Sequence, residues 1–176
     1  MKIQDMTQIA FGAALIASVG FIEIPIGPVP ITLQTLAIMT IAGVFGARKG
    51  FLAVLVYLLL GLIGLPVLSG QGGFAPFVGP TVGYLIAFPI AALLIGWFSE
   101  KHRSIPGLIG YNVVFGLGFV YLLGSIGLEI VVGMSFIDAL KVNIPFIFGD
   151  LLKAVIAAIL AVKISENVQV RRSLAS

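Results

Sequence analysis

Two ionisable residues, Asp150 and Lys153, interrupt a long apolar segment near the end of the chain. The segment from Asn143 to Val162 reads NIPFIFGDLLKAVIAAILAV and is long enough to cross a bilayer as a helix. A charge at mid-membrane costs about 2.5–3.5 kcal/mol on insertion scales, so an ionisable residue there is a functional hypothesis by default. At this spacing on a helix, the two side chains share one face and can reach a common partner or each other.

The pair has two interpretations. In the simpler one, the carboxylate and the ammonium neutralise each other only to permit insertion of the helix. In the other, they bind a polar ligand, and the chemistry favours this reading because Gly149 leaves room beside Asp150 for a ligand to approach. We therefore predict that Asp150 and Lys153 form the polar part of a binding site that the other segments position.

The composition is that of an all-α integral membrane protein. Of the 176 residues, 60% are apolar and 10% are charged, and the 22 glycines suit closely packed membrane helices. The absence of cysteine excludes disulfides, thiolate metal sites and a cysteine nucleophile. The net charge of +3 comes from basic residues in short loops and at the chain ends, so it does not indicate nucleic-acid binding.

Six apolar segments predict six transmembrane helices in a single domain that covers residues 1–176. The first apolar stretch lacks a convincing A-x-A cleavage site, so we expect it to be retained as the first span. The polar tail from Ser165 to Ser176 is expected to be poorly ordered. The predicted spans cover approximately residues 7–22, 31–46, 50–64, 84–98, 105–128 and 143–164.

The charged residues predict the orientation of these spans. The positive-inside rule places both termini in the cytoplasm, because basic residues gather on the side of the termini and acidic residues on the other. The loops 23–30, 65–83 and 129–142 then lie outside, and Asp150 and Lys153 line the base of an outward-facing pocket. The basic side holds Lys2, Arg48, Lys49, Lys101, Arg103, Lys163, Arg171 and Arg172; the opposite side holds Glu23, Glu129, Asp138 and Lys141.

The loop over residues 65–83 reads LPVLSGQGGFAPFVGPTVG and is rich in glycine and proline. Irregular backbone that dips toward the membrane must be buried in protein or line a polar cavity. Leu68, Phe74 and Phe77 would be poorly placed in water, so we predict an extracellular loop that caps a pocket rather than an ordinary surface loop.

Small residues recur along the first span, where Ala10 pairs with Ala14 and Ala13 with Ala17. Such spacings let another helix approach closely in lipid. The partner helix belongs either to the same bundle or to a separate membrane subunit, and the spacing favours neither. A short amphipathic helix is expected around Ser135 to Lys141, where Ser135 precedes Asp138 in a capping-box-like spacing.

Enzymatic motifs are missing from the sequence. It has no G-x-x-x-x-G-K-[ST] phosphate loop, no G-x-S-x-G elbow and no H-E-x-x-H motif. The sole histidine, His102, lies in a predicted cytoplasmic loop, where a solvated role is expected. We therefore predict a protein that is not an enzyme and that uses no cofactor or metal.

Several separated segments, taken in order, resemble the BioY family, the biotin-binding S components of energy-coupling-factor (ECF) transporters. The likeness runs through nearly the whole chain. Val82 stands where the family usually has a second glycine, and the region of Gln71 is a residue shorter than in many relatives. The segments are PVPITLQTL (Pro28 to Leu36), GLPVLSGQGG (Gly64 to Gly73), GPTVGY (Gly79 to Tyr84) and IPFIFGDLLKAVIAA (Ile144 to Ala158).

The resemblance implies a six-helix subunit in the plasma membrane of a prokaryote that takes up biotin from outside. Its expected partners are a transmembrane coupling protein and two ABC-type ATPases. The coupling protein is expected to contact the small-residue face of the first helix, here Ala10, Ala13, Ala14 and Ala17.

The chemistry of biotin suits the predicted pair. We hypothesise that Asp150 accepts a ureido N–H and that Lys153 donates to the ureido oxygen, because charged partners roughly double the strength of a hydrogen bond. Gln71 and Gln34 would complete the polar shell. In an alternative pose Lys153 binds the carboxylate, which inverts the ligand. The apolar part would be covered by Tyr84, Leu68, Phe74 and Phe77.

Three other functions compete with this one. The chain could be a self-sufficient secondary carrier for biotin, an S component for thiamine or riboflavin, or a purely structural subunit. Transport by the chain alone without ATP would favour the carrier, and a lack of small-molecule binding would favour the structural role.

Overall fold

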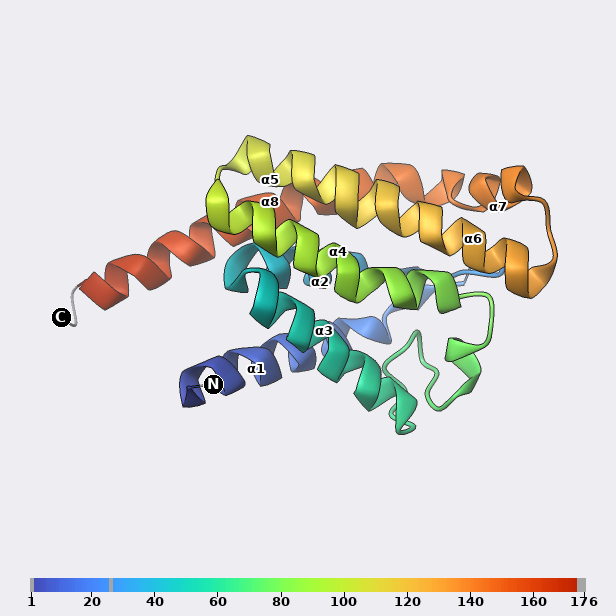
Figure 1. Ribbon diagram of the computed structural model, residues 1–176, viewed down its shortest axis with the longest axis horizontal. Coiled ribbons are helices and arrows are strands. Elements are labelled where there is room, and N and C mark those ends of the chain that lie inside the picture. Colours follow the sequence, from blue (N-terminus) through green and yellow to red (C-terminus); the bar gives the residue numbers. More distant parts are fainter. Residues whose placement is uncertain (1, 26, 174–176) are drawn as a thin grey trace.

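The computed structural model describes residues 2–25 and 27–173, with side-chain environments to residue 167. The chain forms a bundle of long helices with loops at both ends (Figure 1). Four helices come first: α1 (Ile3–Gly20), α2 (Gln34–Phe45), α3 (Ala47–Leu62) and α4 (Val82–Lys101). The others are α5 (Ile105–Tyr111), the π-helix η2 (Asn112–Phe119), α6 (Val120–Val132), α7 (Phe136–Val142) and α8 (Ile144–Ser173), with a 3-10 turn η1 (Ala75–Phe77).

The helices overlap the predicted spans, but their ends differ. α1 begins at Ile3, where the Asp5 carboxylate accepts the Lys2 backbone N–H at 3.2 Å and so caps its first turn. α2 begins only at Gln34, because residues 31 and 32 belong to a short hairpin. α8 continues to Ser173, so the helix extends beyond Ser165, where the predicted tail begins. The expected poor order of that tail stays a prediction, and residues 174–176 lie outside the described part.

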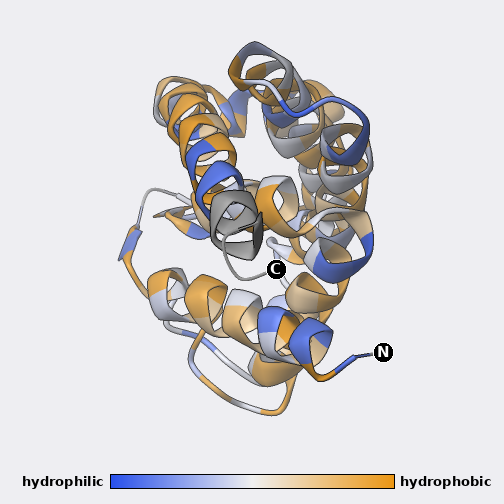
Figure 2. Cartoon of the chain, turned by 90° about the vertical axis from the view of Figure 1, so that its left-hand side faces the viewer, coloured by the Kyte–Doolittle hydropathy of each residue, from blue (hydrophilic) through white to orange (hydrophobic). Residues whose placement is uncertain are grey.

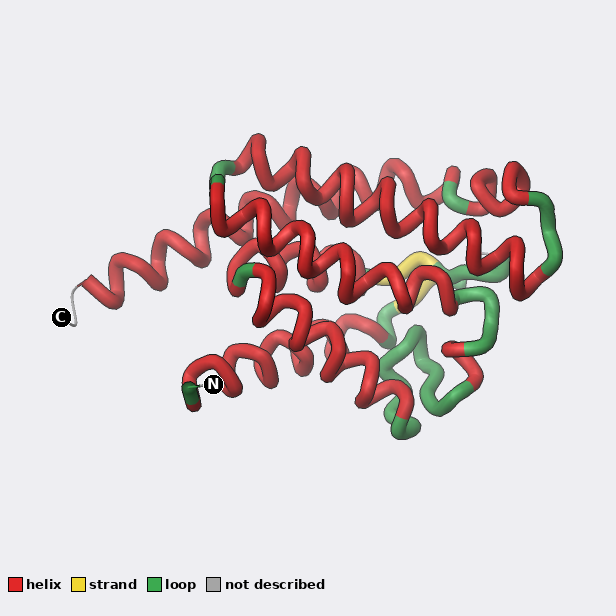
Figure 3. Tube along the Cα trace, viewed as in Figure 1, coloured by secondary structure: helices red, strands yellow, loops and turns green. Residues whose placement is uncertain are grey.

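The hairpin pairs β1 (Glu23–Ile24) with β2 (Ile31–Thr32) in antiparallel register, Glu23 opposite Thr32. Figure 3 shows it at the loop-rich end of the bundle, between α1 and α2. The prolines of this connection prevent a helix from forming there and leave the β2 backbone available to other parts of the chain.

Three helical segments are long and apolar enough to cross a membrane. They are α4 (Val82–Lys101), the continuous helix formed by α5, η2 and α6 (Ile105–Val132), and the part Ile144–Asn167 of α8. Only 39% of the apolar window is buried in each of the last two, so much of their apolar surface faces outward. Exposed apolar area on this scale is expected only where lipid or protein covers it. The chain is therefore a multi-pass membrane protein. α2, at 12 residues, is a shorter apolar helix, and the six spans stay a prediction.

Loops and charges gather at the two ends of the bundle. Both termini and the connections α2–α3 and α4–α5 lie at one end, and the hairpin, the segment 63–81 and the α6–α7 connection lie at the other (Figure 1). Seen from the end of the termini, hydrophobic residues cover most of the helices (Figure 2). Arg48 and Lys49 are in the first turn of α3, next to the α2–α3 connection, and Glu129 is in the last turn of α6, next to the α6–α7 connection, in agreement with the predicted segregation of charge.

The short helix predicted after α6 is confirmed as α7. Ser135 is its N-cap, and the hydroxyl accepts the Asp138 backbone N–H at 3.2 Å. A hydrogen bond from the Lys141 ammonium and a second from the Ser135 hydroxyl lower the pKa of the Asp138 carboxyl. α6 ends at Val132, and Gly133 follows as its C-cap. The positive φ of Gly133, 74°, permits the sharp turn into α7.

α2 is the central helix of the bundle and packs against α1, α3, α4 and α8. Small buried residues such as Ala42, Ala53, Ala87 and Ala157 form much of the core. Without a hydrophobic driving force in lipid, such residues hold helices together by close van der Waals contact. This packing fixes α2, α4 and α8 around one end of the bundle, where the polar side chains meet.

Candidate functional site

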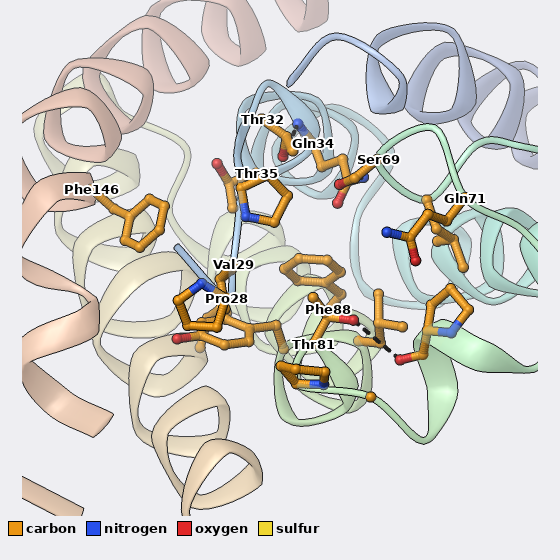
Figure 4. A pocket seen from close by; sticks show the side chains of 18 of the residues that line it. Pro28, Val29, Thr32, Gln34, Thr35, Ser69, Gln71, Thr81, Phe88 and Phe146 are labelled. Carbon is orange, nitrogen blue, oxygen red and sulfur yellow. Dashed lines mark hydrogen bonds between the residues drawn. The ribbon is translucent and has the colours of Figure 1, made fainter. Parts of the chain in front are cut away.

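A cavity of about 160 Å³ lies at the end of the bundle opposite the termini. Its walls come from α2, α4, α6 and α8, and its roof from the hairpin connection and the segment 68–81. Figure 4 shows Thr32, Gln34, Thr35 and Ser69 on one side of it and Phe88 and Thr81 on another. Residues of the predicted capping loop therefore line the cavity, and its role as an extracellular cap stays a prediction.

Asp150 and Lys153 line this cavity from α8. The Lys153 ammonium lies 2.7 Å from Asp150 Oδ1. The Lys153 side chain is 11% exposed and the Asp150 side chain 7%. Lys153 Nζ also donates to the Thr32 backbone carbonyl at 2.6 Å. The prediction that the two share a helix face and reach each other is confirmed.

Two further donors hold the Asp150 carboxylate. The Tyr121 hydroxyl donates to Oδ2 at 2.7 Å, and the Thr35 hydroxyl donates to Oδ1 at 3.3 Å. A carboxylate offers about four acceptor positions and an ammonium has three N–H groups. One acceptor position on Asp150 and one N–H on Lys153 therefore stay unused by the described residues, so the ion pair is neutralised internally and can still bind a ligand.

Four other predicted residues also line the cavity, and three of them are buried. Gln34 is 4% exposed, and its amide nitrogen donates to the Gly20 carbonyl at 3.2 Å. The Tyr84 hydroxyl donates to Asn143 Oδ1 at 2.7 Å, which fixes the phenol ring. Leu68 contributes a buried apolar side chain from the roof.

Gln71 lies at the outer edge of the site. It is exposed, lines the cavity, and exchanges backbone hydrogen bonds of 3.0 Å with Leu68. Its side chain has no hydrogen bond to the described residues, which leaves the amide available at the mouth of the cavity.

Two predicted roof residues do not line the cavity. Phe74 is 68% exposed, and Phe77 is half-buried against the core outside the lining. The reason is the 3-10 turn η1, in which Ala75 and the buried Pro76 face the cavity between them. The prediction for Phe74 and Phe77 is therefore wrong, because it followed apolarity and not the local turn.

The four alanines of α1 also do not form one surface. Ala10 and Ala14 are exposed, whereas Ala13 is 1% exposed and Ala17 is half-buried against the core. Ala13 belongs to the buried stripe of Ile9 and Ile16, at helical spacing, that packs on the neighbouring helices. The predicted partner face is thus wrong for the buried Ala13, whereas for Ala10, Ala14 and the half-buried Ala17 it stays a prediction.

Several lining residues were not predicted. Thr32 and Thr35 flank the start of α2, and Tyr121 reaches Asp150 from α6. A phenol in an otherwise apolar span was the available signal for Tyr121. The apolar lining includes Val29, Phe88, Val120 and Phe146.

The comparisons with known proteins agree with one another. The BioY family model matches residues 1–170. The chain is 38% identical to a probable biotin transporter BioY of Bacillus subtilis, over 94% of this chain and 92% of that protein. It is 42% identical to the biotin transporter BioY2 of Lactococcus lactis, over 90% of this chain and 88% of that one.

A solved structure has the same fold. It is the crystal structure of the S-component for biotin from an ECF-type ABC transporter, and it superposes with a TM-score of 0.88 at 37% identity. The match covers 93% of this chain and 92% of that chain.

Proposed function

The chain belongs to the BioY family, and on this premise we propose that it is the substrate-binding membrane subunit of a biotin uptake transporter. It is a multi-pass protein of a prokaryotic plasma membrane. The observation that carries the proposal is the buried ion pair of Asp150 and Lys153, which lines a cavity and keeps one acceptor and one donor unused.

The cavity matches biotin in kind. The ureido ring has two N–H donors and one carbonyl acceptor; Asp150 accepts one N–H, and Lys153 donates its free N–H to the carbonyl. Charge-assisted bonds of this type are roughly twice as strong as neutral ones. The thiophane ring and the valeryl chain then contact the apolar lining, including Phe88 and Phe146.

The ring-first pose is better supported than the inverted pose. In the inverted pose the biotin carboxylate binds Lys153, where it would meet the Asp150 carboxylate that lies 2.7 Å from the same ammonium. Two like charges that share one buried site repel each other strongly. A neutral ureido ring avoids this repulsion and uses both members of the pair.

Orientation and assembly belong to the same proposal. The basic end of the bundle faces the cytoplasm, so the six spans place both termini inside and the cavity outside. A transmembrane coupling protein and two ABC-type ATPases drive transport, because the chain has no phosphate-binding loop of its own. The segregated charges and the likeness to an S-component support this assembly.

Titration of the detergent-purified chain with labelled biotin tests the proposal. We expect saturable binding that unlabelled biotin displaces and that thiamine and riboflavin do not. The variant Lys163→Met should bind biotin like the wild type. It is the control for changes at Lys153, because Lys163 is an exposed lysine of α8 that lies outside the cavity. A folded chain that shows no saturable biotin binding would reject the assignment, and uptake into liposomes without ATP would favour the secondary carrier.

A further inference from the structure

The roof of the cavity is attached directly to the end of α1. The backbone N–H of Ser69 donates to the Gly20 carbonyl at 3.0 Å. The last carbonyls of a helix have no intrahelical partner, so the Gly20 carbonyl is free to accept this bond. A side chain at Gly20 would collide with the Val67 backbone carbonyl, which means that the roof lies in close contact with α1.

Gln34 reaches the same carbonyl from the cavity side. Its Nε2 donates to Gly20 O at 3.2 Å and makes a longer contact of 3.5 Å with Ser69 Oγ. Because a backbone carbonyl only accepts, the amide nitrogen must point at Gly20 and the amide oxygen away from it. Gln34 of α2 and the backbone of Ser69 in the roof thus donate to the same carbonyl oxygen at the end of α1.

Gln34 lines the cavity. Its amide oxygen has no hydrogen bond to the described residues, and it is not among their buried unpaired atoms. The attachment therefore leaves an acceptor as the unused group of this side chain. A ligand group that donates a hydrogen bond is favoured there, and a ligand carbonyl is not.

We propose that Gln34 is a positioning residue: it holds the Gly20 carbonyl in the place where the Ser69 backbone N–H binds it, so it keeps the roof segment 65–73 fastened and controls how long a ligand stays in the cavity. Tyr57 supplies a second attachment from outside the cavity lining, where its hydroxyl donates to the Val67 carbonyl at 3.2 Å. The fastening is a property of the ligand-free chain. Only its effect on biotin residence rests on the proposed function.

Hydrogen exchange of the ligand-free protein in detergent tests the fastening. In Gln34→Met, which keeps the length of the side chain but removes the donor, amide exchange over residues 65–73 should be faster by roughly 5- to 10-fold, the loss expected for one hydrogen bond. Exchange in α4 and α8 should be unchanged. Gln4→Met is the control, because Gln4 is an exposed glutamine of α1 that lies outside the cavity lining and whose side chain has no hydrogen bond to the described residues. Wild-type exchange over 65–73 in Gln34→Met would overturn the proposal.

Ligand kinetics separate positioning from simple contact. We expect Gln34→Met to raise the biotin dissociation rate by roughly 10-fold and to change the association rate much less. Faster dissociation with unaltered exchange in the ligand-free state would make Gln34 a ligand contact only and would overturn the positioning role. If biotin does not bind at all, the proposed function fails, while the exchange result still decides the fastening.

Two further variants keep the test decisive. Ser69→Ala removes only the long hydroxyl contact, so we expect wild-type exchange; a full effect there would shift the role from the Gly20 carbonyl to the hydroxyl and contradict the proposal. Should Gln34→Met fail to fold, Gln34→Leu tests the same point, because its side chain has no group that donates to Gly20. The same rise in exchange over 65–73 is expected, and its absence would contradict the fastening.

Discussion

The Tyr121 hydroxyl lies 2.7 Å from Asp150 Oδ2, on the carboxylate oxygen that Lys153 does not bind. This contact joins α6 to α8 at the cavity wall. It directs the carboxylate so that Oδ1 faces the ammonium, while Oδ2 keeps one acceptor position for a ligand.

Removal of this hydroxyl is expected to weaken ligand binding. In Tyr121→Phe the carboxylate loses a charge-assisted hydrogen bond, which is worth about 1.5–3 kcal/mol. Biotin affinity should therefore fall roughly 10- to 100-fold, as measured by equilibrium binding. Tyr111→Phe is the control, because Tyr111 packs against Phe98 away from the cavity lining. Equal losses in the two variants would contradict the role of Tyr121.

The ion pair should be more costly to break than to remove. Lys153→Met leaves the Asp150 charge buried without its partner, and such a change typically costs about 3–5 kcal/mol of stability. The double variant Asp150→Asn/Lys153→Met has no charged side chain at either position, so no charge is left buried without a partner. It should recover most of the lost stability. Thermal unfolding in detergent measures both; a double variant as unstable as Lys153→Met would speak against a coupled pair.

The ring-first pose predicts tolerance of a blocked ligand carboxylate. Biotin methyl ester should bind to the wild type within roughly 10-fold of biotin, because the ureido ring makes the charge-assisted bonds. Asp150→Asn should weaken both ligands alike. If the ester binds far worse than biotin in the wild type, Lys153 contacts the carboxylate and the inverted pose is correct.

The exposed face of α1 predicts where a coupling protein binds. Ala14→Trp adds bulk at an exposed small residue and should reduce co-purification of a co-expressed coupling protein and its ATPases, because a close helix approach needs small side chains. Biotin binding should be unaffected. Val114→Trp, at an exposed position of η2, is the control. Normal assembly of Ala14→Trp would place the interface elsewhere.

Ala13 should behave differently from its neighbour. Ala13 is buried where α1 packs against the rest of the bundle. Ala13→Trp therefore overpacks the core and should lower the melting temperature in the absence of any partner. Ala14→Trp should melt like the wild type. Equal melting of both variants would contradict the described packing of α1.

The sequence predicts the polar centre of the site better than its roof. A charge inside an apolar helix is rare and costly, so Asp150 and Lys153 were visible without a structure. Phe74 and Phe77 were misplaced because the orientation of a side chain in a glycine- and proline-rich loop depends on local turns that composition does not specify. Ala13 could have been assigned to the interior from its spacing with Ile9 and Ile16.

Uncharged polar residues were the hardest to predict. Thr35 and Tyr121 cost little in a membrane helix, so the sequence gives no signal for Thr35 and only a weak one, a phenol in an apolar span, for Tyr121. Their role appears only when α2, α6 and α8 are packed together around Asp150. Gln34 was predicted as a site residue, but its hydrogen bond to a carbonyl at the end of another helix is seen only in the packed structure.

The central claim is that the buried pair of Asp150 and Lys153 binds the ureido ring of biotin. The most direct measurement compares biotin affinity in the wild type, Lys163→Met and the neutral double variant Asp150→Asn/Lys153→Met, each shown to be folded by its melting curve. We expect Lys163→Met to bind like the wild type and the double variant to lose roughly 100-fold or more, the equivalent of about 3 kcal/mol for two charge-assisted hydrogen bonds. Undiminished biotin binding by a folded double variant would contradict the account.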